Sequence, residues 1–161
     1  MSRKRKAGLL LSACLGLAPC QNVWALLQSC TVSAVGVNFG IYNPLSGTAN
    51  TAMGTVTVTC TVTLIDLFES WTVALSAGNS SNYTSRSLAN GSSILSYNLY
   101  TSAAYTNVWG NGSGSTSLVS GNVTLAVGTT QTNYTVYGRI PAGQDSAAGM
   151  YMDTIVVTLN Y

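Results

Sequence analysis

Apolar and polar residues alternate with a period of two along most of the chain, and this alternation predicts β-strands. The clearest example is the run TVTVTCTVTL at 55–64. Its apolar members all fall on one side of the period, and they are Val56, Val58, Cys60, Val62 and Leu64. We therefore predict a strand with one face in a core and the other formed by a ladder of threonines.

Further alternating runs predict strands at 70–78, 94–101, 122–128 and 133–141, preceded by a less regular segment at 30–42. Segments rich in Gly, Ser, Asn and Pro separate them, and two contain the turn dipeptides Asn90-Gly91 and Asn111-Gly112. Short strands at roughly ten-residue spacing favour an all-β, immunoglobulin-like sandwich over a closed barrel.

The final run, GMYMDTIVVTLNY at 149–161, predicts a strand that also has one apolar face. That face consists of Tyr151, Ile155, Val157, Leu159 and Tyr161. A strand at a sheet edge exposes unpaired backbone groups that can pair with another chain. We therefore expect this strand to need a partner strand beside it.

The N-terminal residues have the composition of a secretory signal peptide. MSRKRK supplies four positive charges, a run of about a dozen apolar residues follows, and Val23-x-Ala25 fits a cleavage site. The apolar run is shorter than the roughly 20 residues that span a bilayer. We predict cleavage after Ala25, with residues 26–161 forming one domain.

Cleavage would change the charge of the chain, because four of its six cationic residues precede Ala25. The remaining two arginines against four acidic residues give a net charge of −2. This charge excludes a phosphate-binding surface, so we expect no nucleic-acid partner. The two cysteines left, Cys30 and Cys60, predict one disulfide in an exported protein.

Catalytic chemistry finds little support, because the chain contains no histidine to act as a general base. Two carboxylate pairs could in principle serve a glycosidase, Asp145 with Asp153 and Asp66 with Glu69, although solvated loop or edge charges are the simpler explanation. Asp153 lies on the core side of its strand and should need a partner such as an arginine. We predict no enzyme, no metal, no cofactor and no small-molecule substrate.

Four stretches resemble the spore coat protein U domain family, which includes pilin subunits of archaic chaperone-usher pili. They are CTVSAVGVNFGIYNP, GTVTVTC, LSYNLYTSAAYTNVWG and YTVYGRIPAGQDSAAGMYMDTIVVTLNY, and the resemblance covers residues 30–161. It implies an incomplete immunoglobulin-like fold that lacks its last strand, which leaves a groove beside the C-terminal strand. A periplasmic chaperone, and then the N-terminal extension of a neighbouring subunit at the outer-membrane usher, would fill this groove.

The resemblance implies a structural or adhesive pilus subunit at the cell surface, acting in attachment and biofilm formation. Only four residues, 26–29, would precede Cys30, and they are too short for a donor strand. We therefore expect a chain-terminating position near the pilus tip, unless cleavage occurs elsewhere or the subunit docks differently. Candidate surface-contact residues in predicted loops are Leu45, Leu67, Phe68 and Trp109, for which core packing is the simpler explanation. The alternative function is a self-sufficient secreted coat or cell-surface structural protein.

Overall fold

The computed structural model describes residues 28–62, 67–125 and 127–161. The predicted signal peptide and its cleavage site lie outside the described residues. In the described part the fold is all-β, apart from the single 3₁₀ turn η1 (Gly78–Ser80), so the predicted fold class is confirmed. No helix there is long and apolar enough to span a membrane.

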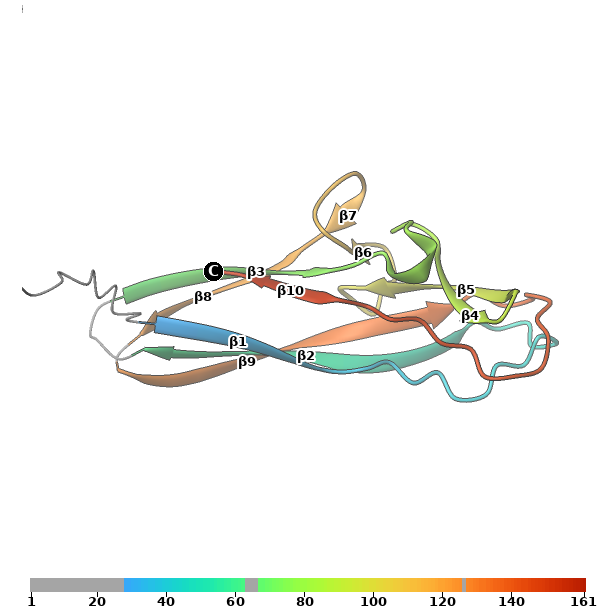
Figure 1. The fold of residues 1–161 in the computed structure, drawn as a ribbon, viewed down its shortest axis with the longest axis horizontal. Coiled ribbons are helices and arrows are strands. Elements are labelled where there is room, and N and C mark those ends of the chain that lie inside the picture. The colour runs from blue at the N-terminus through green and yellow to red at the C-terminus, as the bar shows by residue number, and fades with distance from the viewer. Residues whose placement is uncertain (1–27, 63–66, 126) are drawn as a thin grey trace, which may run out of the picture.

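The strands form two sheets that pack as a sandwich (Figure 1). The large sheet has the order β1 (Gln28–Val35), β2 (Asn50–Val62), β9 (Gly128–Ile140), β5 (Ser93–Tyr100), β6 (Val108–Trp109) and β7 (Thr116–Ser117), and β4 (Arg86–Asn90) also pairs with β5. The small sheet has the order β10 (Val157–Asn160), β3 (Leu67–Leu75) and β8 (Val119–Leu125). Consequently β1 and β10 are both edge strands.

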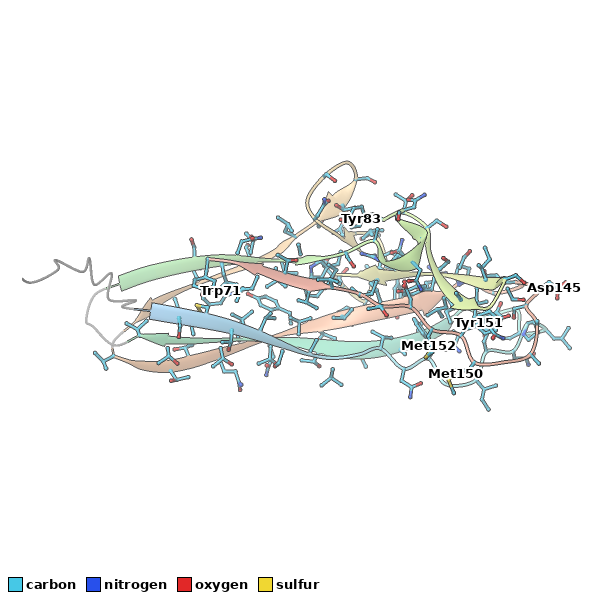
Figure 2. The ribbon with its side chains drawn as sticks, viewed as in Figure 1. Trp71, Tyr83, Asp145, Met150, Tyr151 and Met152 are labelled. Atoms are coloured by element: carbon cyan, nitrogen blue, oxygen red, sulfur yellow. A yellow bond between two sulfur atoms is a disulfide. The ribbon has the colours of Figure 1, made fainter. Side chains whose placement is uncertain are left out.

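The core lies between the sheets and follows the predicted alternation. Val56, Val58, Cys60 and Val62 of β2 are each 1% exposed, because β1 and β9 flank β2 along most of its length. The alternating apolar residues of the strands predicted at 70–78 and 94–101, now β3 and β5, are also buried, and they are Trp71, Val73, Leu75, Leu95, Tyr97 and Leu99. Figure 2 shows Trp71 pointing into the space between the two layers.

The Cys30–Cys60 disulfide is present and joins β1 to β2 inside the core. The two cysteines are directly opposite each other in the antiparallel register, with their Cα atoms 4.1 Å apart. The bridge therefore fixes an edge strand to the centre of the large sheet.

Several predictions from the sequence are wrong. Trp109, which was a candidate surface-contact residue, is completely buried in β6, where its Nε1 donates to the Val73 carbonyl oxygen at 2.9 Å. Leu67 and Phe68 belong to β3 and pair with β8, so they are not in a loop. Val127, which falls in the strand predicted at 122–128, is 58% exposed and lies between the end of β8 at Leu125 and the start of β9 at Gly128.

The C-terminal strand is also shorter than predicted. Regular pairing of β10 begins only at Val157, and the preceding segment is attached by an isolated bridge between Met152 and Ala89. The segment changes neighbours from β4 to β3 along its length, so it cannot keep one continuous register.

Candidate functional site

A groove separates the edges of the two sheets, between β1 and β10. Within the described residues β1 pairs only with β2, and β10 pairs only with β3. Figure 1 shows β10 running beside β1. The groove has a volume of about 200 Å³, and its walls are largely apolar, with Ala34, Val35, Val37 and Phe39 on one side and Ile155 and Val157 on the other.

The backbone of β1 offers hydrogen-bonding groups to this groove. Directly opposed residues in antiparallel strands alternate between wide, hydrogen-bonded pairs and narrow pairs whose N–H and C=O groups point away from each other. The 4.1 Å separation of Cys30 and Cys60 identifies a narrow pair. The N–H and C=O groups of Cys30, Val32 and Ala34 therefore point to the free edge of β1.

The backbone of β10 also has hydrogen-bonding groups at its free edge. The Ser76 N–H donates to the Val156 carbonyl oxygen at 2.9 Å, whereas the Leu75 N–H turns to the other side and donates to Gly110. Val156 is thus bonded to β3, and the backbone groups of Ile155, Val157 and Leu159 face the free edge. Their side chains are half-buried and pack against the core cluster.

The groove therefore combines half-buried apolar side chains with unpaired backbone groups on both of its edges. Once β1 and β10 move apart to about twice the usual strand spacing, a β-strand inserted between them would satisfy both, because it would supply backbone partners on two sides and alternate side chains to the core.

The five residues predicted for a partner-strand groove do not all lie in it. Ile155 and Val157 line the groove, and Leu159 continues the same row along β10. Tyr151 lies at the end of the sandwich opposite the C-terminus (Figures 1 and 2), in a neighbouring depression of about 810 Å³ that shares Val37 and Phe39 with the groove. Tyr161 is 57% exposed and belongs to another depression beside Trp71.

The opposite wall was missed by the sequence reasoning. It comes from the segment after β1, where Phe39 stacks edge-on against Tyr97 with ring centroids 5.8 Å apart. The signal was present as apolar residues at 35, 37, 39 and 41, but the glycines between them obscured its meaning.

One charged side chain, that of Asp153, also lines the groove. Its Oδ2 accepts a hydrogen bond from the Tyr97 hydroxyl and its Oδ1 accepts one from the Asn79 N–H, both at 2.8 Å. Burial raises the pKa of the Tyr97 hydroxyl, and the hydrogen bond to Asp153 raises it further. Asp153 therefore fastens the start of the C-terminal segment to β5 and η1.

The partner of Asp153 is a tyrosine, and the arginine suggested by the sequence has another role. Arg86 is completely buried and donates to the carbonyl oxygens of Ser76 and Trp109 and to the side chain of Asn98, at 2.6–3.1 Å. Burial lowers the pKa of its guanidinium. Arg86 thus ties together chain segments around β3, β5 and β6.

The carboxylate pairs form no recognisable catalytic arrangement. Asp145 is exposed on the loop before the C-terminal segment, while the two oxygens of Asp153 accept hydrogen bonds from the protein itself. Asp66 and the side chain of Glu69 lie outside the described part of the chain. No cluster of potential metal ligands occurs among the described residues.

The family model of the Spore Coat Protein U domain matches residues 18–158. The chain belongs to this family. A curated relative of this chain is "Protein U" of Myxococcus xanthus, which is 32% identical over 137 residues. That alignment covers 78% of the present chain and 71% of the relative.

The domain also resembles a chain in the crystal structure of the CsuC–CsuE chaperone–tip adhesion subunit pre-assembly complex, from archaic chaperone-usher Csu pili of Acinetobacter baumannii. The TM-score is 0.56 at 24% sequence identity, over 84% of the present chain. The spore coat protein U domain spans only 40% of that chain. This likeness supports the immunoglobulin-like sandwich.

Proposed function

We propose that this protein is a non-enzymatic subunit of a chaperone-usher pilus, and that the groove between β1 and β10 accepts a partner strand. The observation that carries the proposal is the groove itself, where core-facing side chains and unpaired backbone groups coincide on both edges. Membership of the family and the likeness to a chain in a chaperone–subunit complex support it.

The energetic reason for a partner strand is the incomplete burial of the β10 side chains. Full burial of a valine, leucine or isoleucine side chain stabilises a fold by about 1.5 to 3 kcal/mol relative to exposure. Ile155, Val157 and Leu159 obtain only part of this stabilisation. Net stabilities are about 5 to 15 kcal/mol, so an added strand would change the stability substantially.

The partners would be a periplasmic chaperone first, and then an outer-membrane usher and neighbouring subunits. This route requires export, for which the predicted signal peptide at 1–25 would serve. The final location would be a pilus at the cell surface. Sequencing the N-terminus of the exported protein tests cleavage after Ala25 and, with it, the chain-terminating position near the tip.

Attachment and biofilm formation are the further part of this proposal. Leu45 and Ile41 are 92% and 93% exposed in the connection between β1 and β2, where they are available for contact with a surface. Of the two candidate surface-contact residues whose side chains the structure describes, Leu45 and Trp109, Leu45 has the exposure that such a role needs. Replacing both residues with serine should lower attachment of piliated cells to plastic without lowering the amount of pili.

The groove can be tested with a synthetic strand of about ten residues that alternates valine and threonine. Urea unfolding of the purified full chain, with and without this peptide, should show a higher midpoint when the peptide is present. Val157→Asp should abolish the shift, because the charge would enter the groove. Val156→Asp is the matched control, since Val156 is 59% exposed and faces outward on the same segment.

A self-sufficient coat or cell-surface protein is the alternative, favoured by the description of the family as a spore coat domain. It predicts the same unfolding midpoint with and without the peptide, and full stability without a chaperone. That result would exclude the open groove and the pilus function together.

A further inference from the structure

The outer face of the large sheet carries a group of side chains unrelated to the groove. Val136, Gly138 and Ile140 of β9 are buried, so the alternating residues Tyr137 and Arg139 point outward. Tyr100 of β5 is directly opposite Tyr137 across the sheet. With Tyr105, these residues form what we call the tyrosine–arginine cluster.

The cluster is held together by aromatic contacts. The rings of Tyr100 and Tyr105 meet edge to face, with centroids 5.4 Å apart and planes at 88°. The Arg139 Cζ lies 5.5 Å from the centroid of the Tyr105 ring. A guanidinium in this position is attracted to the face of the ring and is held in a defined orientation.

Tyr105 occupies a backbone conformation that is unusual for its type. Its φ is 54°, in the left-handed region where glycine, asparagine and aspartate are far more frequent than tyrosine. The loop that carries it is closed by two hydrogen bonds, from the Tyr105 N–H to Ser102 and from the Thr101 N–H to Asn107, both 3.1 Å. Strain of this kind concentrates at functional sites, and here it fixes the ring beside Arg139.

The charge of Arg139 distinguishes this face from the rest of the described surface. Arg86 and Arg139 are the only cationic side chains in 28–161, and Arg86 is completely buried. Arg139 is exposed and lies against an aromatic ring, with no ion pair to a described residue. It is therefore available to an anionic ligand.

The surroundings of the cluster are rich in hydroxyl groups. Thr51 is opposite Arg139, and the threonine face of β2 continues from there along the sheet. Met53, opposite Tyr137 and 67% exposed, is the apolar neighbour on β2. The rest of this neighbourhood carries threonine hydroxyls, which suit a ligand that itself carries many hydroxyl groups.

We propose that the tyrosine–arginine cluster binds an acidic polysaccharide. Arg139 pairs with a carboxylate or sulfate group through its planar fork of N–H donors. The tyrosine rings lie against the apolar faces of the sugar rings, and the neighbouring threonines exchange hydrogen bonds with sugar hydroxyls. The net charge of −2 for residues 26–161 would repel a polyanion in general, so binding must depend on this local site.

The test measures binding of the exported full chain to three polymers, alginate with carboxylates, dextran sulfate with sulfates, and neutral dextran. The cluster lies on the outer face of the large sheet, so it stays accessible whether or not a strand or chaperone occupies the groove. We expect binding to one or both charged polymers and none to dextran. The preferred charged polymer identifies the anionic group.

Substitutions at two residues, Arg139 and Tyr105, test the site. Arg139→Gln should weaken binding to the charged polymer at least tenfold, and Arg139→Lys by a smaller factor, because lysine keeps the charge without the fork. Tyr105→Asn should weaken binding similarly while leaving the urea midpoint unchanged or higher, since asparagine tolerates the left-handed backbone. Thr61→Gln, at the far end of the same face, is the control that should bind normally.

Equal binding of the wild-type chain and Arg139→Gln would overturn the proposal, as would equal binding to dextran and the charged polymers. Failure of every acidic polymer to bind would also overturn it and leave the cluster as a contact for another protein. None of these results depends on the peptide-induced stabilisation that tests the groove.

Discussion

Val58 in β2 and Val157 in β10 are identical side chains that face the same core from two regions of the sandwich. Val58 is 1% exposed, whereas Val157 is only half-buried. The difference lies in their neighbours, because β2 has β1 and β9 on its two sides and β10 has only β3 among the described strands.

Alternation alone therefore does not determine burial. A period of two places a side chain on the inner face, but its cover also depends on what lies beside it, and Val157 has a neighbouring strand on one side only among the described strands. The edge strands β1 and β10 have inward-facing side chains but each has only one neighbouring strand among the described strands, and their outer backbone groups remain available for pairing.

The largest effect should come from removing the Cys30–Cys60 bridge, which attaches the β1 margin to the centre. The double variant Cys30→Ser/Cys60→Ser should lose about 3 to 4 kcal/mol of unfolding free energy in the chain-entropy treatment of a loop of this size. Urea unfolding measures the loss. Reduction of the wild-type protein should reproduce it, and an unchanged midpoint after reduction would contradict the role of the bridge.

The next-largest effect comes from making the same substitution, valine to alanine, in β2 and in β10. Val58→Ala should cost about 2 to 3 kcal/mol, because it removes buried methyl groups and leaves a cavity in the core. Val157→Ala should cost about 1 kcal/mol in the isolated chain, since its side chain has less burial to lose. Urea unfolding of both variants provides the measurement.

Addition of the alternating valine–threonine peptide should reduce the difference between these two costs. The cost of Val157→Ala should then approach that of Val58→Ala, while the cost of Val58→Ala should stay the same. Equal costs for the two substitutions without any peptide would mean that the inward side chains of β10 are already covered.

The sequence was sufficient to predict the central region and one wall of the groove. The alternation at 55–64 identified the inward residues of β2, and the alternation at 155–159 identified the inward face of β10. Both depend only on the local period of the strand, which a sequence displays directly.

The features that the sequence did not predict depend on contacts between distant segments. Trp109 lies in a two-residue strand without a readable period, and its burial comes from its hydrogen bond to Val73 and its contact with Tyr134. Arg86 is buried because carbonyl groups from other segments surround it. Neither burial leaves a periodic signal in the chain.

The third effect concerns the edge of β5 at Ser96, where a side chain forms the hydrogen bonds that a neighbouring strand would form. The Gln144 amide accepts from the Ser96 N–H and donates to the Ser96 carbonyl oxygen, both at 2.8 Å, as a neighbouring strand would. Gln144→Met keeps the volume and removes both bonds, and it should cost about 1 to 3 kcal/mol because partly buried backbone groups lose their partners. Thermal or urea unfolding measures the cost, and Asp145→Asn on the adjacent exposed position is the control that should change little.

The smallest effect at neutral pH should be that of Tyr97→Phe, which removes the hydroxyl from the wall of the groove at the cost of about one hydrogen bond. This cost shrinks and then reverses in alkali, because burial raises the pKa of Tyr97 in the folded protein above the value of about 10 expected after unfolding. As the pH rises above about 10, the unfolded chain releases the Tyr97 proton while the folded protein keeps it, so the wild-type protein should lose stability.

The urea midpoint of the wild-type protein should therefore fall more steeply than that of Tyr97→Phe between about pH 9 and 11. Asp153→Asn separates the two causes of the shift. If burial is the larger cause, this variant should keep most of the alkaline loss even though the carboxylate is gone. Parallel midpoint curves for the wild-type protein and Tyr97→Phe would show that the phenol of Tyr97 titrates alike in both states, and that this wall of the groove is open to water.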